Sequence, residues 1–115
     1  MRVVENRNRR EQTAIYYVDI DETICFYEGG RHYPSALPHL DRIEKINNLY
    51  DEGNTIVYWT ARGTQTGIDW TDLTRKQLTQ WGAKFHDIKL GKPHFDYYIC
   101  DKSINSEKYF NGKRK

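Results

Sequence analysis

Two aspartates separated by one residue follow a short apolar run near the start of the chain. Asp19 and Asp21 come directly after Ile15-Tyr16-Tyr17-Val18, in the string Asp19-Ile20-Asp21-Glu22-Thr23. A carboxylate can attack phosphorus and form a covalent intermediate, which divides the very slow hydrolysis of a phosphate monoester into two easier steps. The spacing predicts Asp19 as this nucleophile, with Asp21 protonating the leaving oxygen and later deprotonating the attacking water.

Polar groups that suit a phosphate follow later parts of the chain. Thr60, Ala61 and Arg62 come after the apolar run at 55–59, and Lys92 lies in the turn at 91–93. The Thr60 hydroxyl and nearby backbone amides, including that of Ala61, can donate hydrogen bonds to phosphoryl oxygens. Arg62 has a forked guanidinium suited to phosphate, and Lys92 supplies a point charge. Such donors stabilise the negative charge of a transferring phosphoryl group.

A third carboxylate, that of Asp101, follows the apolar run at 97–100. Carboxylates gathered at one site repel by about 4 kcal/mol per pair at a separation of about 4 Å and an effective dielectric constant of about 20, so they need a cation. Mg²⁺ prefers hard oxygen ligands and bridges carboxylates to a substrate phosphate. We therefore expect Mg²⁺ to be held by the carboxylates of Asp19 and Asp101 and by the backbone carbonyl of Asp21.

The elements that must position these groups are read from apolar periodicity. Strands are expected at 15–18, 55–59, 85–90 and 97–100, and helices at 40–50, 69–81 and 103–110. The stretch 21–38 is expected to be a loop with a small flap near 28–30. Strands alternating with helices imply a parallel, Rossmann-like sheet with helices on its faces, in three layers. Ligands of such sheets bind beyond the carboxyl ends of the strands, where the predicted site residues would gather.

Length and charge indicate one domain with basic ends. The 115 residues fit a single domain, which we place at 15–110 between tails at 1–14 and 111–115. The net charge of +2 divides into +2 for residues 1–14, +4 for 108–115 and −4 for 15–107. An acidic body suits a bound cation, and the basic tails meet either phosphate polymers or only water.

The cysteine content and the hydropathy of the sequence indicate its cellular compartment. The two cysteines, Cys25 and Cys100, are too few for the disulfide framework of a small secreted domain. The sequence has no apolar stretch approaching the roughly 20 residues of a membrane span and no apolar core of a signal peptide. We therefore expect a cytoplasmic protein without a membrane partner, and the sequence leaves its oligomeric state open.

The motifs, taken in order, resemble those of the haloacid dehalogenase superfamily of phosphatases, specifically its short members without a cap domain. Asp19-Ile20-Asp21-Glu22-Thr23 is similar to the first motif, whose two aspartates are nucleophile and acid/base. Thr60, Lys92 and Asp101 match the second, third and fourth motifs. The strings at 59–63 and 91–93 also resemble small bacterial and viral members often linked by name to capsular polysaccharide biosynthesis.

Two positions depart from the family pattern. The first motif often has glycine where Glu22 stands, and similar members have an aspartate where Cys100 precedes Asp101. Cysteine is a poor partner for Mg²⁺, so either Asp101 alone supplies the carboxylate or the metal is held more weakly. Asp96 is expected to brace its loop.

The leading expectation is a Mg²⁺-dependent phosphatase of a small phosphorylated metabolite such as a sugar phosphate. Tyr27, His32 or Tyr33 of the first loop would rim the substrate. The basic tails leave open the removal of a phosphate from a nucleic-acid end, which steep salt dependence would favour. A receiver-like signalling module or a non-catalytic phosphate and metal binder is the alternative from another class.

Overall fold

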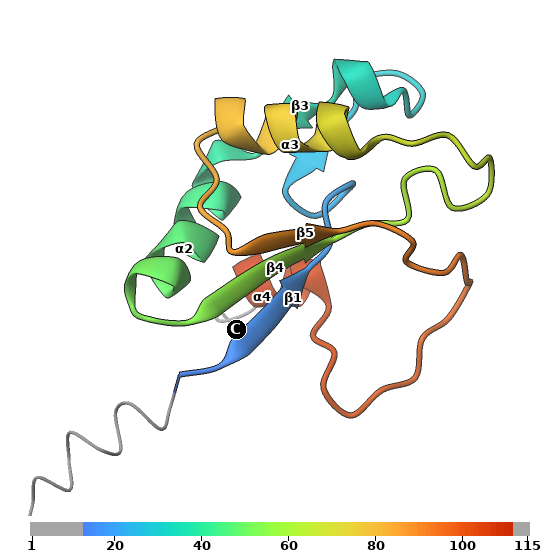
Figure 1. Ribbon diagram of the computed structural model, residues 1–115. Coiled ribbons are helices and arrows are strands. Elements are labelled where there is room, and N and C mark those ends of the chain that lie inside the picture. The colour runs from blue at the N-terminus through green and yellow to red at the C-terminus, as the bar shows by residue number, and fades with distance from the viewer. Residues whose placement is uncertain (1–12, 112–115) are drawn as a thin grey trace, which may run out of the picture.

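The computed structural model describes residues 13–111, so nearly all of both expected tails lies outside the described chain. Its elements follow one another along the chain as shown in Figure 1: β1 (Ile15–Val18), β2 (Cys25–Phe26), the 3-10 turn η1 (Tyr33–Ser35), β3 (Leu37–Pro38), α2 (Leu40–Asp51), β4 (Thr55–Trp59), α3 (Thr71–Gln80), β5 (Asp87–Lys89) and α4 (Ser106–Asn111). None of the described helices has the length and apolar character needed to cross a membrane.

The main sheet is parallel and has the strand order β1-β4-β5. Ile15 pairs with Thr55 at the start of β1, and Val57 pairs with Asp87 where β4 meets β5. Each strand in turn is added on the same side of the one before it. Because parallel crossovers are right-handed, this order places α2 and α3 on the same face of the sheet. The parallel, Rossmann-like α/β architecture expected from the sequence is confirmed.

The core lies between that face and the helices. It contains Val18, Ile56 and Tyr58 from the sheet, packed with Ile43 of α2 and Leu78 of α3. α4 joins the same layer, because Arg42 of α2 pairs with Glu107 and lies over the ring of Phe110.

The opposite face of the sheet has no helix among the described residues. Ile15 and Tyr17 point to it and are 69% and 51% exposed. The described chain therefore has two layers where the sequence predicted three. The difference arises because the strand order never reverses, and a reversal is what would place a crossover helix on the second face.

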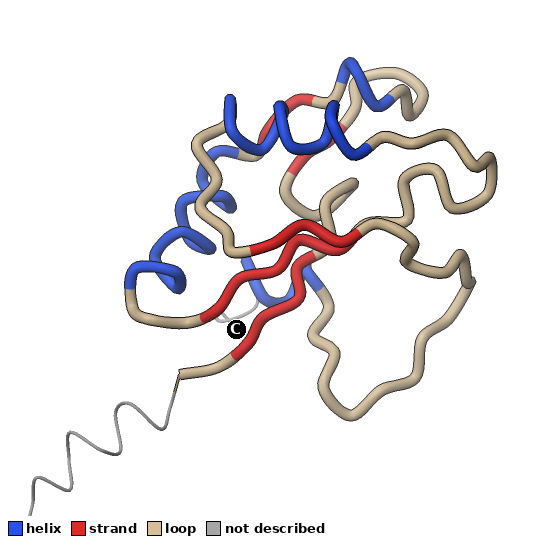
Figure 2. Tube along the Cα trace, in the orientation of Figure 1, coloured by secondary structure: helices blue, strands red, loops and turns tan. Residues whose placement is uncertain are grey.

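The predicted fourth strand at 97–100 is wrong in this structure. Those residues form no strand, and Tyr97 and Ile99 are 89% and 97% exposed. Figure 2 shows the chain after β5 leaving the sheet in a long loop before it reaches α4. A β-rich composition favours a strand only when a neighbouring strand is in place to pair with it.

The loop predicted at 21–38 contains a small ladder of its own. Cys25 and Phe26 of β2 pair antiparallel with Pro38 and Leu37 of β3. The backbone turns sharply before β2, at Glu22, whose φ of 64° lies in the left-handed region. Glycine is the residue that adopts this conformation without steric cost.

Candidate active site

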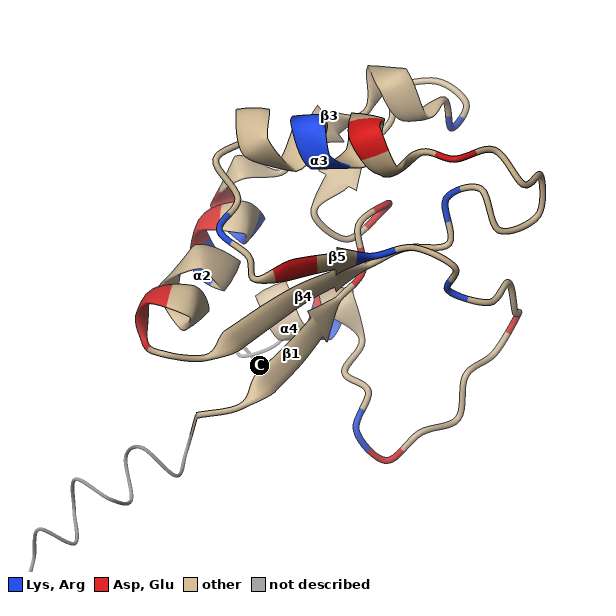
Figure 3. Cartoon of the chain, in the orientation of Figure 1, with Lys and Arg blue, Asp and Glu red and all other residues tan. Residues whose placement is uncertain are grey.

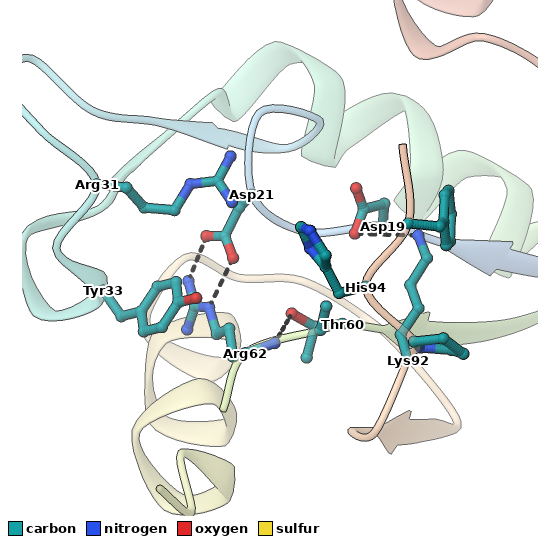
Figure 4. A pocket seen from close by; sticks show the side chains of 11 residues that line it. Asp19, Asp21, Arg31, Tyr33, Thr60, Arg62, Lys92 and His94 are labelled. Atoms are coloured by element: carbon teal, nitrogen blue, oxygen red, sulfur yellow. Dashed lines mark hydrogen bonds and ion pairs between the residues drawn. The ribbon is translucent and has the colours of Figure 1, made fainter. Parts of the chain in front are cut away.

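A cavity of about 220 Å³ opens at the carboxyl ends of β1 and β4. Six of the seven predicted site residues line it: Asp19, Asp21, Thr60, Ala61, Arg62 and Lys92. Figure 4 shows Asp21 facing Arg62 on one side of the cavity and Asp19 facing Lys92 on the other, with His94 between them. Residues from three distant parts of the chain therefore meet at the carboxyl ends of the parallel strands, as the sequence predicted.

Asp19 is the carboxylate that remains open to the cavity. Its side chain is 42% exposed, and one carboxylate oxygen lies 3.6 Å from Nζ of Lys92. Partial burial raises the pKa of Asp19, while the positive charge of Lys92 opposes that rise. The group is therefore partly desolvated and has Lys92 as its cationic neighbour, which leaves it able to act as a nucleophile.

Lys92 is positioned through its backbone. Its N–H donates to the carbonyl oxygen of Thr60 at 3.1 Å, and its own carbonyl accepts from the hydroxyl of Thr64 at 2.7 Å. Nζ lies 5.3 Å from the centre of the Trp59 ring. These contacts tie the turn after β5 to the end of β4 and direct the ammonium toward Asp19.

Thr60 presents a hydroxyl whose orientation is constrained. Oγ1 accepts a hydrogen bond from the backbone N–H of Arg62 at 3.1 Å. A hydroxyl that accepts in this way still has its own hydrogen to donate. Because Thr60 lines the cavity, that hydrogen can be given to a phosphoryl oxygen bound there.

Arg62 has a different role from the expected phosphate fork. Its side chain is fully buried, and Nε and Nη2 donate to the two carboxylate oxygens of Asp21 at 3.0 and 2.9 Å. Nη1 donates to Thr74 at 3.1 Å and to Gln77 at 2.7 Å. Four of the five guanidinium N–H groups are thus committed to protein partners. In this structure Arg62 holds Asp21 instead of pointing its fork at a ligand.

Asp21 is consequently fixed as a carboxylate. Burial alone would raise the pKa of Asp21, but hydrogen bonds and the charge of Arg62, with further hydrogen bonds from Tyr27 and Cys25, lower it overall. Burial raises the pKa of the Cys25 thiol to about 12, so that thiol stays protonated and can serve as a donor. Asp21 is therefore held in its ionised form, and Arg62 opposes its protonation.

Sequence reasoning missed the polar pair on α3 that completes this arrangement. Thr74 and Gln77 are buried, and Gln77 also donates to the backbone carbonyl of Tyr33 at 2.7 Å. Leu73, on the same helix, is only partly buried. Polar residues at spacing three beside a buried Leu78 were the signal that could have revealed a polar face directed at the site.

The first loop contributes to the cavity in part as expected. Tyr33 lines it, with its ring 4.8 Å from the guanidinium carbon of Arg62. Tyr27 instead donates its hydroxyl to Asp21, and His32 is exposed and outside the cavity lining. Arg31 and His94 also line the cavity and were not singled out from the sequence.

Asp101 is the predicted site residue that the structure does not bring to the cavity. It is exposed in the loop between β5 and α4, and within residues 13–111 no three His, Cys, Asp or Glu side chains are grouped to hold a metal ion. The carboxylate of Asp19 fits Mg²⁺ in donor type, as does the backbone carbonyl of Asp21. Mg²⁺ is commonly held by one or two carboxylates and substrate phosphates. The donor chemistry fits, and the third predicted ligand is out of position.

Comparisons with known proteins bear on the fold. No model of a protein family matches the chain, and no curated protein matches it. The chain is similar to a crystal structure of a target protein from Vibrio cholerae, with a TM-score of 0.76 and 25% sequence identity over 86% of this chain and 89% of that one. The similarity supports the Rossmann-like α/β fold.

Proposed function

We propose that this chain is a Mg²⁺-dependent phosphomonoesterase of the haloacid dehalogenase type, without a cap domain, that acts on small phosphorylated metabolites such as sugar phosphates. The observation that carries the proposal is the meeting of the Asp19 carboxylate, the Thr60 hydroxyl and the Lys92 ammonium at one open cavity. This combination offers a nucleophile and two donors for phosphoryl oxygens.

The first step is attack by a carboxylate oxygen of Asp19 on phosphorus. A new O–P bond forms as the ester P–O bond breaks, and the leaving oxygen departs as an alcohol after receiving a proton. Lys92 and Thr60 hold the phosphoryl oxygens as their negative charge redistributes. Bound Mg²⁺ would neutralise charge between the carboxylate and the phosphoryl group.

The second step returns the enzyme to its starting state. Water attacks the aspartyl-phosphate, inorganic phosphate leaves and the Asp19 carboxylate is regenerated. Asp21, held as a carboxylate by Arg62, takes the proton of the attacking water. That proton is the one given to the leaving alcohol of the next cycle, so a single residue serves both steps.

The size of the cavity supports a small substrate. A volume of about 220 Å³ accommodates a phosphoryl group and a few neighbouring atoms, and the rest of a larger substrate would lie outside it. Arg31 and Tyr33 from the first loop and His94 from the later loop line the cavity together with the proposed catalytic groups. These side chains would contact the part of the substrate next to the phosphate.

The test is turnover of p-nitrophenyl phosphate and a set of sugar phosphates in MgCl₂ by the wild type, Asp19→Asn and Asp96→Asn. An amide cannot form the phosphoenzyme, so Asp19→Asn should lose at least about 10³-fold in kcat. Asp96→Asn keeps its activity because that exposed residue does not line the cavity. Undiminished turnover by a folded Asp19→Asn protein, or no turnover of any ester by the wild type, would overturn the proposal.

A further inference from the structure

The face of the main sheet that holds Ile15 and Tyr17, called the bare face below, carries no helix among the described residues. Sheets whose strands are all parallel occur almost only in proteins that cover both faces, because such strands are apolar on both sides. β1 and β4 have this composition, since neither strand contains a charged residue. A parallel sheet with one bare face therefore indicates that another surface packs on it.

An apolar stripe crosses the bare face from β1 to β4. Tyr17 is 51% exposed, and its ring meets the ring of Trp59 edge to face, with the centroids 5.5 Å apart. Val57 pairs in register with Tyr17 and is buried, although it does not belong to the core on the helix side. Ile15, 69% exposed, extends the stripe along β1. Removing these apolar side chains from water is favourable, so the stripe suits an interface.

Two opposite charges border the stripe on β5. Side chains alternate along a strand, and Ile88 joins the core on the helix side, so Asp87 and Lys89 stand on the bare face. Figure 3 shows the acidic and the basic residue at the two ends of β5, beside strands without charge. Neither residue forms an ion pair within the described chain. One carboxylate oxygen of Asp87 accepts the N–H of Ile88 at 2.8 Å, which keeps this charge at the border of the stripe.

This arrangement of charges is self-complementary. In a two-fold symmetric contact, each copy uses the same surface. An axis that runs across the strands places β5 of one copy antiparallel on β5 of the other, and β4 on β4. Asp87 of each copy then meets Lys89 of the other, and the apolar stripes face one another at the separation of about 10 Å that packed sheets adopt. A second copy of the chain thus supplies the complementary charges in the required order.

We propose that the bare face binds a second copy of this chain and forms a two-fold symmetric dimer through β1, β4 and β5. Three strands about 4.8 Å apart and about 15 Å long present a footprint of about 200 Å². A standard interface buries about 800 Å² on each partner, so this dimer belongs to the weak class and should dissociate on dilution. The inference is independent of the proposed phosphatase activity, because the contact is made by the sheet face and not by the cavity.

Sedimentation velocity of the full chain tests the dimer and its geometry together. Between about 5 and about 500 μM we expect the wild type to pass from monomer to dimer, as a weak interface requires. Asp87→Lys and Lys89→Asp each bring like charges together in both pairs and should raise the dissociation constant by about tenfold or more. The double variant with both substitutions exchanges the two charges and should restore the affinity of the wild type.

A second pair of variants tests the apolar stripe. Tyr17→Glu places a charge in the centre of the contact and should leave the chain monomeric over the same concentrations. Tyr97→Glu changes a tyrosine of the loop after β5 that is 89% exposed and lies outside the bare face, and it should dimerise as the wild type does. Circular dichroism checks that each variant is folded, and the charge exchange decides the question if Tyr17→Glu is not. A wild type that stays monomeric, or a dimer that neither single charge reversal weakens, would overturn the inference.

Discussion

The two sides of the cavity are built in opposite ways. On the buried side, Asp21 and Arg62 form an ion pair whose side chains are 7% and 0% exposed, and Thr74 and Gln77 accept two further hydrogen bonds from Arg62. On the open side, Asp19 is 42% exposed and meets Lys92 at 3.6 Å. A buried charge needs partners within the protein because leaving it unpaired costs free energy, whereas an exposed charge is solvated by water until a ligand binds. The charges of the buried side are thus paired within the protein, and those of the open side remain accessible to a ligand.

The largest expected effect comes from breaking the buried pair. Arg62→Met should destabilise the fold by about 3–5 kcal/mol, because it leaves the Asp21 carboxylate buried without its cation. Lys84→Met is the matched control, since Lys84 and Asp51 form a 2.8 Å pair that is half exposed on both sides. It should cost about 1 kcal/mol or less. Urea unfolding measures both, and an Arg62→Met protein as stable as Lys84→Met would show that the buried pair stabilises the fold no more than an exposed pair does.

The next effect concerns the turn that follows Arg62. A Cβ at Gly63 would lie 2.0 Å from the carbonyl oxygen of Ile68, and φ there is +82°. Gly67 has nearly the same φ, +81°, with nothing within 4 Å of its Cβ position. Gly67→Ala should cost about 1–2 kcal/mol from the left-handed backbone alone, and Gly63→Ala about 2–4 kcal/mol because it adds a clash.

Thermal unfolding of the two glycine variants gives the comparison directly. Gly63→Ala should also lower the proposed phosphatase activity more than Gly67→Ala, because the turn that it distorts carries Arg62, which pairs with Asp21. Equal melting temperatures for the two variants would show that the turn adapts without strain, and that the buried side is less rigid than its hydrogen bonds indicate.

The same contrast explains which parts of the molecule could be predicted from sequence. β1, β4, α2 and α3 were predicted because their signals are local, and Asp19, Thr60 and Lys92 converge wherever parallel strands end together. The role of Arg62 was missed because it depends on Thr74 and Gln77, which reach it only through the packing of α3.

The failure at 97–100 has a separate cause. A strand is a property of two segments, and the composition of one of them does not show whether the other is available. The third layer was predicted for a similar reason, since alternation of strands and helices does not reveal whether the strand order reverses. Predictions from sequence therefore held where local signals or the shared edge of parallel strands decide the outcome.

A smaller effect is expected from strain on the buried side. Glu22, the residue after Asp21, is the one described non-glycine residue with a positive φ, 64°. Glu22→Gly should stabilise the fold by about 0.5–1 kcal/mol, because relief of the left-handed conformation exceeds the added freedom of the unfolded chain. The pair of Glu22 with Arg31, at 3.7 Å and half exposed, contributes little to the balance.

Glu28→Gly is the control for that gain, since Glu28 lies in the same loop and has no positive φ. It adds freedom to the unfolded chain without relieving strain and should be neutral or slightly destabilising. Chemical denaturation of both proteins measures the difference. A Glu22→Gly protein less stable than Glu28→Gly would show that the side chain of Glu22 contributes more than its backbone costs.

The smallest effect is expected on the open side, in the loop that carries Asp101. Ile99 is 97% exposed, so Ile99→Ala in metal-free protein should change the free energy of unfolding by no more than about 0.5 kcal/mol. Ile20, fully buried beside Asp19, gives the contrast, because Ile20→Ala should cost about 2–5 kcal/mol. A loss above about 1 kcal/mol for Ile99→Ala without metal would mean that the segment is already packed on the protein. The two sides of the cavity would then differ only in their exposure to water, because the loop on the open side would be packed on the protein without a ligand.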